Sequence, residues 1–468
     1  MIDFENVCFS YEEGVPILQD INFSVKAGEC AILCGKSGMG KSTILRAISG
    51  LVPLFYEGSM TGKVKVDGVD PVNFNSQDRA KSFGVVSQDP RSQFFMNIVQ
   101  DEICFAAENI GMSAKEILKK LIDVSKLLNI ENLLSRNLDG LSSGEKQKVA
   151  IASALLLKPK VLILDEPISN IDKRGVDNLI EVLKLIKSLG IAIIISEHRL
   201  IQFKDVADKF LHIYEGKITE VWYKKDFDKI SNEKLIGLGL RPKSIKKTST
   251  LKDNKQKSIV LDISHVSYKY EKTYTGISDI DLKIYEGEVI SLMGDNGSGK
   301  TTLCKVISGL LKEQSGKLLY RNTSIKRKRR NKICYFVMQD ADYQLYSDSI
   351  ESEILLGKKI SSQANKKLNT SLDMFNLQGI KNRHPASLSG GEKQRVILAA
   401  AYCSDAEIYI LDEPTSGIDG DGLNAIIQWV NTLSHMGKTV IIITHDELLS
   451  TAISDRIIYL ADGRINVK

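Results

Sequence analysis

Short apolar runs bounded by polar residues recur along the chain. The clearest are Cys30–Cys34, Val161–Asp165, residues 191–196, Val289–Met293, Ile408–Asp412 and residues 440–444. Continuous apolar runs of this length are typical of strands that are buried on both faces of a parallel sheet. In each half a segment of helical character follows the first run, at residues 42–48 and 301–307. The pattern therefore predicts an α/β fold.

The chain also repeats itself once. Motifs of the first half return in the same order in the second half, at residues 35–42 and 294–301, 141–145 and 388–392, and 163–167 and 410–414. The second copy is slightly shorter between its first and third motifs, a difference that loops absorb. The repeat predicts a first domain at residues 1–222, a linker at residues 223–257 and a second domain at residues 258–468. Within the lysine-rich linker we expect a short helix near residues 232–238, followed by a solvated tether.

Composition narrows the class of protein only a little. Hydrophobic residues make up 43% and charged residues 26%, as in soluble globular domains, and the net charge of +5 identifies no partner. The seven cysteines contain no CxxC pair and indicate reduced thiols in the cytosol. We expect no signal peptide, and no apolar run approaches the roughly 20 residues of a membrane span, so a role at a membrane requires a partner protein. A basic run at residues 326–330 is interpreted as a surface loop, with anionic lipid or nucleic acid as the alternative.

The first repeated motif fits the phosphate-binding pattern G-x-x-x-x-G-K-[ST] in both copies. Each copy lies between a predicted strand and a predicted helix, where glycines let backbone N–H groups surround a phosphate. We expect Lys41 and Lys300 to reach the β- and γ-phosphates, and the hydroxyls of Ser42 and Thr301 to bind Mg²⁺. The predicted ATP-binding residues of the two loops are Gly35, Lys36, Ser37, Gly38, Met39, Gly40, Lys41, Ser42 and Thr43, and Gly294, Asp295, Asn296, Gly297, Ser298, Gly299, Lys300, Thr301 and Thr302.

A carboxylate pair ends one apolar run in each half. Asp165 and Asp412 come last in their runs and are predicted to hold Mg²⁺. Glu166 and Glu413 follow directly and are predicted to act as general bases that polarise the water attacking the γ-phosphate. The predicted cofactors are therefore ATP and Mg²⁺.

A histidine follows the next apolar run of each half. His198 and His445 stand at the same distance from the two aspartates. A lone histidine after a strand is usually structural, but two at matching positions are better interpreted as catalytic residues. We expect them to contact the γ-phosphate and to orient the attacking water.

The order of these motifs resembles the ATP-binding cassette (ABC) family, once per half. Its most specific element is the LSGGE-like segment, at residues 141–145 and 388–392. The resemblance implies tandem P-loop domains, each with a mainly parallel sheet, an antiparallel β subdomain and a helical subdomain. It also implies ATP contacts from the opposite domain by Ser142, Gly144, Ser389 and Gly391, Mg²⁺ contacts by Gln88 and Gln339, and adenine stacking by Tyr11 and Tyr270. For the two tyrosines, a core or surface role is the alternative.

In that family the two domains pair head to tail within one chain and share two ATP sites. Each site of this chain would then combine the phosphate loop of one half with the LSGGE-like segment of the other. The departure between the copies is Ser143, which stands where the second copy has Gly390. Because a serine keeps its backbone N–H, we expect both sites to hydrolyse ATP.

Two function classes fit this architecture. One is the motor of a membrane transporter, and the other is a tandem ABC ATPase without a membrane partner, acting in translation or DNA repair. The segments after Gln88 and Gln339 contain aromatic residues that we expect to be exposed. Their sequence is similar to that of the ATPases of energy-coupling factor transporters, which import vitamins and metal ions into prokaryotes. The resemblance implies a transmembrane coupling protein and a substrate-binding membrane protein as partners, no nucleic acid, and a place on the cytoplasmic face of a prokaryotic membrane.

Overall fold

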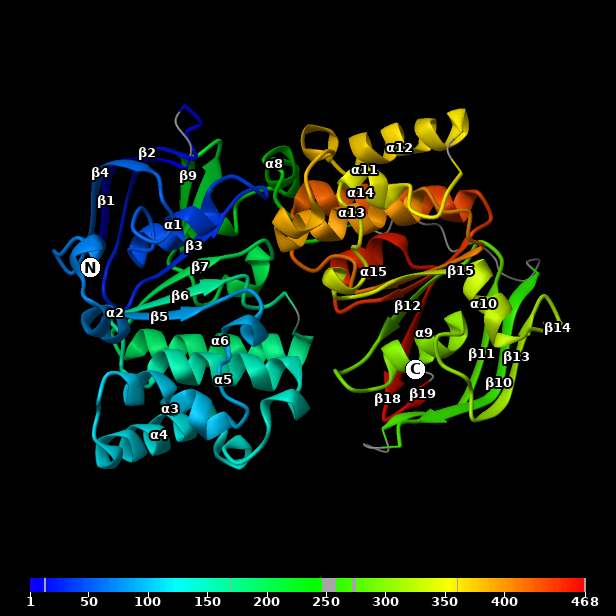
Figure 1. The fold of residues 1–468 in the computed structure, drawn as a ribbon, viewed down its shortest axis with the longest axis horizontal. Coiled ribbons are helices and arrows are strands. Elements are labelled where there is room, and N and C mark those ends of the chain that lie inside the picture. Colours follow the sequence, from blue (N-terminus) through cyan, green and yellow to red (C-terminus); the bar gives the residue numbers. More distant parts are fainter. Residues whose placement is uncertain (12–13, 170, 246–257, 272–274, 360, 467–468) are drawn as a thin grey trace. The chain divides into compact units, whose positions relative to one another are not determined.

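The computed structural model describes residues 1–11, 14–169, 171–245, 258–271, 275–359 and 361–466. The chain forms two compact units, Met1–Lys243 and Ser244–Lys468, and each unit has its own sheets and its own hydrophobic core (Figure 1). Within the described residues, no helix combines the length and the apolar character needed to cross a bilayer.

The first unit is built on two sheets. Its strands are β1 (Ile2–Ser10), β2 (Leu18–Val25), β3 (Cys30–Cys34), β4 (Ser59–Val66), β5 (Phe83–Val86), β6 (Val161–Asp165), β7 (Ala192–Ser196), β8 (Lys209–Tyr214) and β9 (Lys217–Tyr223). The larger sheet has the order β5-β6-β7-β3-β8-β9 and is parallel except for β9. The smaller sheet, β2-β1-β4, is antiparallel. All five residues of β3 and of β7 are buried, which explains why the sequence of each strand is almost continuously apolar.

The helices of the first unit are α1 (Lys41–Ile48), α2 (Ser76–Ser82), α3 (Val99–Asn109), α4 (Ala114–Leu128), α5 (Ser143–Leu155), α6 (Lys173–Ser188), α7 (Lys224–Phe227) and α8 (Asn232–Gly237). Helices α5 and α6 lie along one face of the parallel sheet, and α3 and α4 lie beyond α5 (Figure 1). Helix α4 begins with a capping box, because the Ser113 hydroxyl accepts from the N–H of Glu116 and the Glu116 carboxylate accepts from Ser113.

The second unit repeats this plan. Its strands are β10 (Ile259–Lys269), β11 (Gly276–Tyr285), β12 (Val289–Met293), β13 (Ser315–Tyr320), β14 (Thr323–Ser324), β15 (Cys334–Val337), β16 (Ile408–Asp412), β17 (Thr439–Ile443), β18 (Arg456–Ala461) and β19 (Arg464–Asn466). The order β15-β16-β17-β12-β18-β19 matches that of the first unit strand for strand. The antiparallel sheet is β11-β10-β13-β14.

The helices of the second unit are α9 (Lys300–Ser308), α10 (Arg327–Ile333), α11 (Ile350–Ile354), α12 (Ser362–Met374), α13 (Gly390–Tyr402), α14 (Gly420–His435) and α15 (Glu447–Ile453). The predicted fold class is confirmed in both units: a mainly parallel sheet, an antiparallel β subdomain and a helical layer.

The end of the first unit differs from the expected boundary at residue 222. Helices α7 and α8 follow β9, and Phe227, Leu235 and Leu240 are buried in the first unit's core. These side chains tie the segment to the unit, which therefore extends to Lys243. The expected helix near residues 232–238 is present as α8, whereas the expected tether at residues 246–257 lies outside the described residues.

The basic run at residues 326–330 is not a loop, as the sequence had indicated, but enters helix α10. Arg330 is only 1% exposed and forms an ion pair with Glu313. A guanidinium buried beside a carboxylate holds the helix against the unit, while the other residues of the run remain exposed.

Candidate active sites

The phosphate loop of the first unit joins β3 to α1. Gly40 has φ +98° and precedes the helix directly, a left-handed conformation that favours glycine. A Cβ on Gly35 would collide with the main-chain oxygen of Ile213, so that position also requires glycine. The Lys41 ammonium group curls back over the loop and donates to the carbonyl oxygens of Gly35 (2.9 Å) and Lys36 (2.8 Å). The positive charge is thus held at the centre of the loop.

The second unit builds the same loop between β12 and α9. Gly299 has φ +101°, and the Lys300 ammonium group donates to the carbonyl oxygens of Gly294 (2.6 Å) and Asp295 (2.9 Å). Lys41 and Lys300 are each 6% exposed. Both loops therefore present one buried cation and a helix N-terminus, the combination that binds phosphate groups.

A hydroxyl and a carboxylate meet at the end of each loop. Ser42 Oγ donates to Asp165 Oδ2 (3.1 Å), and Thr301 Oγ1 donates to Asp412 Oδ2 (2.8 Å). Burial, followed by the charge of Glu166, raises the pKa of Asp165, and burial raises the pKa of Asp412 to about 6. Buried carboxylates of this kind are stabilised in their charged form by a nearby cation. Since hydroxyl and carboxylate oxygens are the donors that Mg²⁺ prefers, both sites fit this ion.

The predicted base of the first unit, Glu166, follows β6 with φ +45°. Its N–H donates to the Ser196 carbonyl of β7 (2.9 Å), which fixes the backbone beside the sheet edge. Gln88 Nε2 donates to Glu166 Oε2 (2.8 Å), and His198 Nε2 lies 3.4 Å from Glu166 Oε1. Burial by itself raises the pKa of Glu166, but the contact with His198 and the nearby positive charges outweigh it, so that the pKa is lowered overall. The lowered pKa favours the ionised carboxylate, which is the form that a general base requires.

Glu413 occupies the matching place in the second unit. It has φ +46°, its N–H donates to the Ile443 carbonyl (2.9 Å), and His445 Nε2 lies 3.5 Å from its Oε1. The N–H of His445 donates to Glu413 Oε2 (3.3 Å). His445 Nε2 also lies 3.1 Å from Oδ1 of the phosphate-loop residue Asn296. The structure thus brings the predicted base, the predicted histidine and the phosphate loop together in each unit.

The LSGGE-like segments open helices α5 and α13. Ser142 and Ser389 each form a capping box, with Glu145 and Glu392 respectively. Ser142 and Ser389 are thus N-cap residues whose N–H groups donate to these glutamates, and Gly144 and Gly391 lie in the first turn of a helix of thirteen residues. This arrangement suits an anion, as the resemblance implies for Ser142, Gly144, Ser389 and Gly391.

The two predicted adenine-stacking tyrosines are half-buried. The Tyr11 hydroxyl accepts from Arg46 Nη1 (2.9 Å) and lies 3.2 Å from Thr43 Oγ1, so its ring is joined to helix α1. Tyr270 packs edge-on against Tyr268, with ring centroids 5.1 Å apart. Both rings lie in the antiparallel β subdomain or at its edge, and their stacking role remains a prediction.

Sequence reasoning missed a second difference between the copies, beside the histidines. The first copy has Glu197 and Arg199 around its histidine, whereas the second has Thr444 and Asp446. Glu197 is 3% exposed, and its Oε1 accepts from the N–H groups of His198 (2.7 Å) and Arg199 (3.1 Å). Ser143 is therefore not the sole departure. Aligning the residues next to the histidines would have revealed the second one.

Fold and site together define a P-loop ATPase with two cassettes. The model of the ABC transporter family matches residues 18–169 and 277–416, and the chain belongs to this family. A Treponema denticola protein named "Putative ABC transporter ATP-binding protein" is 35% identical over 472 residues, which cover 99% of this chain and 96% of the relative. The Bacillus subtilis protein named "Putative HMP/thiamine import ATP-binding protein YkoD" is 31% identical over 493 residues, covering 99% and 90%.

Solved structures with two cassettes resemble the whole chain. "RNase-L Inhibitor" matches with a TM-score of 0.67 and 25% identity, over 98% of this chain and 90% of that one. A chain in "Model of ribosome-bound archaeal Pelota and ABCE1" matches with a TM-score of 0.72 and 25% identity, over 98% and 77%. Proteins named as transporter ATPases and a chain in a ribosome-bound complex thus both resemble this chain over most of its length.

Proposed function

We propose that this chain is the Mg²⁺-dependent, ATP-hydrolysing motor of a membrane importer of the energy-coupling factor type, which carries a vitamin or a metal ion. The relatives named as transporter ATPases and the import protein from Bacillus subtilis support a transport role. The expected partners are a transmembrane coupling protein and a substrate-binding membrane protein. The motor would act on the cytoplasmic face of a prokaryotic membrane.

One observation carries this proposal. Large aromatic side chains are exposed to solvent in the loop that follows each predicted Mg²⁺-sensing glutamine, Gln88 or Gln339. Phe95 is 74% exposed in the first unit, and Tyr343 and Tyr346 are 67% and 76% exposed in the second. Exposed apolar side chains gathered on one loop are typical of a surface that binds another protein. A helix of a membrane subunit, with an apolar face, is the partner that we propose for this surface.

These loops are held in place by buried carboxylates. Glu102 Oε2 accepts from the N–H groups of Phe95 (2.8 Å) and Met96 (2.9 Å), and Glu353 Oε2 accepts from those of Tyr346 and Ser347 (both 2.7 Å). Each of the two glutamates is 5% exposed. In both copies a buried carboxylate fixes the backbone of the aromatic loop. The aromatic side chains are therefore exposed because the loop is held in this conformation, and not because it is loosely packed.

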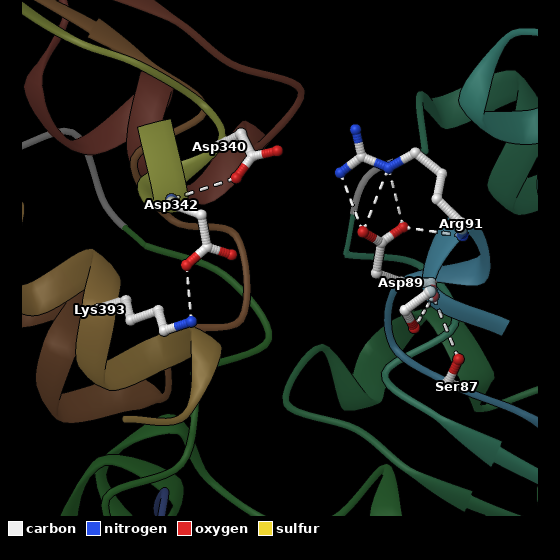
Figure 2. A network of polar contacts seen from close by, with 7 residues as sticks. Ser87, Asp89, Arg91, Asp340, Asp342 and Lys393 are labelled. Atoms are coloured by element: carbon white, nitrogen blue, oxygen red, sulfur yellow. Dashed lines mark hydrogen bonds and ion pairs between the residues drawn. The ribbon is translucent and has the colours of Figure 1, made fainter. Parts of the chain in front are cut away.

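A hollow lies beside this loop in the second unit. A cavity of about 500 Å³ is lined by Tyr343, Leu345, Tyr346, Leu356 and Ile397, among others. Its lining combines aromatic and aliphatic side chains, as a groove that receives an amphipathic helix requires. A further contact shapes the loop in Figure 2, where Lys393 of α13 pairs with Asp342 (2.6 Å). Movement of the docked helix would thus reach the LSGGE-like segment that opens α13.

The ATP sites follow from head-to-tail pairing of the two units, which we also propose. Site one would join Lys41, Asp165 and Glu166 to Ser389 and Gly391, and site two would join Lys300, Asp412 and Glu413 to Ser142 and Gly144. Mg²⁺, held by the hydroxyl and aspartate of each site with Gln88 or Gln339 nearby, would neutralise charge on the phosphates. Glu166 and Glu413 would take the proton of the attacking water, while His198 and His445 orient it.

The second candidate function is a tandem ATPase without a membrane partner. It is favoured by the likeness to "RNase-L Inhibitor" and to the chain in the ribosome-bound complex. Their 25% identity is lower than that of the transporter-named relatives, at 35% and 31% over nearly the whole chain. The aromatic loops also offer an apolar surface, whereas binding to ribosomal RNA depends on basic contacts to phosphate.

Tagged chain purified from detergent-solubilised membranes tests the proposal. We expect a small, many-helix membrane protein to co-purify with the wild-type chain. Phe95→Ala combined with Tyr346→Ala should lower its recovery roughly tenfold or more, as loss of central apolar anchors does. Tyr223→Ala, at a tyrosine that is 58% exposed outside these loops, is the matched control and should leave recovery unchanged. Recovery only with ribosomes or DNA would overturn the transport role.

A further inference from the structure

Glu197 is a buried acid beside the first active site that the proposed reaction does not use. It follows β7, and its N–H donates to the Leu33 carbonyl of β3 (3.0 Å), which places it at the sheet edge that carries the phosphate loop. Its Oε1 accepts from the N–H groups of His198 and Arg199. Its Oε2 is buried and has no hydrogen-bond partner among the described residues. A buried carboxylate that uses one oxygen to cap the histidine loop is costly, so it calls for a function.

The second unit shows what happens without this acid. Thr444 stands in its place, and the threonine hydroxyl accepts from the N–H of Asp446 (3.0 Å) in the same loop. The N–H of His445 then donates to Oε2 of the predicted base Glu413 (3.3 Å). One main-chain donor thus has different acceptors in the two copies: Glu197 in the first and the base itself in the second.

This exchange changes what holds the base. In both units Oε1 of the base faces the imidazole of the histidine, at 3.4 and 3.5 Å. In the second unit Oε2 is anchored on the main chain through His445. In the first unit Oε2 accepts from the side-chain amide of Gln88 (2.8 Å), on the loop that leads to exposed Phe95, and the N–H of His198 is occupied by Glu197. A side-chain partner on a surface loop can move away, whereas a main-chain N–H beside a strand cannot.

We infer that Glu197 is a positioning residue: by occupying the N–H of His198, it leaves Glu166 dependent on Gln88 and so makes turnover at site one responsive to the Gln88 loop. The unit with Thr444 lacks this device. Burial, followed by the charge of Glu166, raises the pKa of Glu197, in keeping with an acid that is close to the base and does not pair with it. The inference rests on the proposed hydrolysis of ATP at site one and does not depend on the membrane partner.

A double-mutant cycle in the Glu413→Gln background, where turnover comes from site one, tests the inference. With Glu197 present, Gln88→Ala should lower kcat roughly tenfold. Glu197→Thr should let His198 N–H bind Glu166, so that Gln88→Ala then lowers kcat less than about threefold, with KM for ATP changed less than about twofold. Glu197→Gln keeps a carbonyl oxygen as acceptor and should retain the full effect of Gln88→Ala. If Gln88→Ala has the same effect with Glu197 in place and in the Glu197→Thr variant, the inference is overturned.

The reciprocal change covers the case in which Glu197→Thr does not fold. Thr444→Glu, studied in the Glu166→Gln background, supplies the second unit with the missing acceptor and should increase the effect of Gln339→Ala on kcat by about threefold or more. Crystal structures of the two variants give a readout without turnover: His198 N should lie within hydrogen-bond distance of Glu166 in Glu197→Thr, and His445 N should leave Glu413 in Thr444→Glu. Failure of the acceptor to change in these structures would end the inference even if both proteins hydrolyse ATP normally.

Discussion

The first and second units carry equivalent motifs, with the same lysine, aspartate, glutamate and histidine at matching positions, but hold their predicted bases differently. Glu166 is bound by the Gln88 side chain, and Glu413 is bound by the main chain of His445. The loops after the glutamines differ as well, as Figure 2 shows: Asp89 of the first unit pairs with Arg91 of the same loop, whereas Asp342 of the second unit pairs with Lys393 of α13. Matching residues at the sites therefore do not imply matching control, because neighbouring side chains decide what each residue is tied to.

Loss of both bases should have the largest effect. We expect Glu166→Gln combined with Glu413→Gln to lower the ATPase rate by about 10²–10⁴-fold, since no carboxylate is left to accept the proton of water. Each single variant should keep measurable turnover, because each site has its own base. ATPase assays at saturating ATP check this, with ATP binding as the control for folding. If one single variant abolishes activity and the other leaves it untouched, the two sites are not equivalent in hydrolysis.

Loss of the buried arginine of α10 tests the stability of the second unit. Arg330→Met removes the partner of Glu313 and should destabilise this unit by about 3 kcal/mol. The change should shift the unfolding transition of the second unit to lower denaturant concentration and leave that of the first unit in place. Arg327→Met, at an exposed residue of the same helix, should stay within about 0.5 kcal/mol of wild type. Similar shifts for the two variants would contradict the buried ion pair.

Loss of the histidine should lower kcat in the second unit no more than in the first. His198→Ala leaves Glu197 and Gln88 as neighbours of the first site, so we expect a loss in kcat of about tenfold from the missing imidazole. His445→Ala keeps the main-chain N–H that anchors Glu413, so its effect should come from the imidazole alone and be equal or smaller. Measurements in Glu413→Gln and Glu166→Gln backgrounds assign the rates to the two sites. A much larger loss for His445→Ala would show that the main-chain contact has little weight.

The loop ion pairs should have the smallest effect. Asp342 is 69% exposed and its partner Lys393 is 18% exposed, so Asp342→Ala should lower the free energy of unfolding by only about 0.5 kcal/mol. We expect Asp342→Ala to act mainly on the coupling between partner binding and ATP turnover, because the Asp342–Lys393 pair joins the aromatic loop to α13. Stimulation of ATP turnover by the proposed membrane partner should therefore fall with Asp342→Ala more than with Arg91→Ala, whose pair with Asp89 stays within one loop. Equal stimulation in both variants would mean that the Lys393 contact does not transmit the signal.

Much of the fold could be predicted because its signals are local. The apolar runs that become β3, β6, β12 and β16 are buried almost completely, so their pattern in the sequence is continuous and easily recognised. The segment after β9 was harder to interpret. Phe227 is isolated among polar residues, and Leu235 and Leu240 lie in a short apolar stretch within a lysine-rich segment, so only packing against the first unit shows that they belong to its core. The same reason hid the buried role of Arg330, whose neighbours in the sequence are all solvent-exposed cations or polar groups.

The sequence by itself determined the family, the duplicated α/β plan and the residues of both phosphate loops. These features depend on short motifs, which are recognised from the types of their residues and the spacing between them along the chain. The tertiary structure alone decided which atom each predicted residue contacts. His445 lies beside Asn296, and Gln88 reaches Glu166, each across a long interval of sequence. Contacts of this kind arise from the meeting of separate strands at one sheet edge, and the order of residues along the chain does not encode their distances.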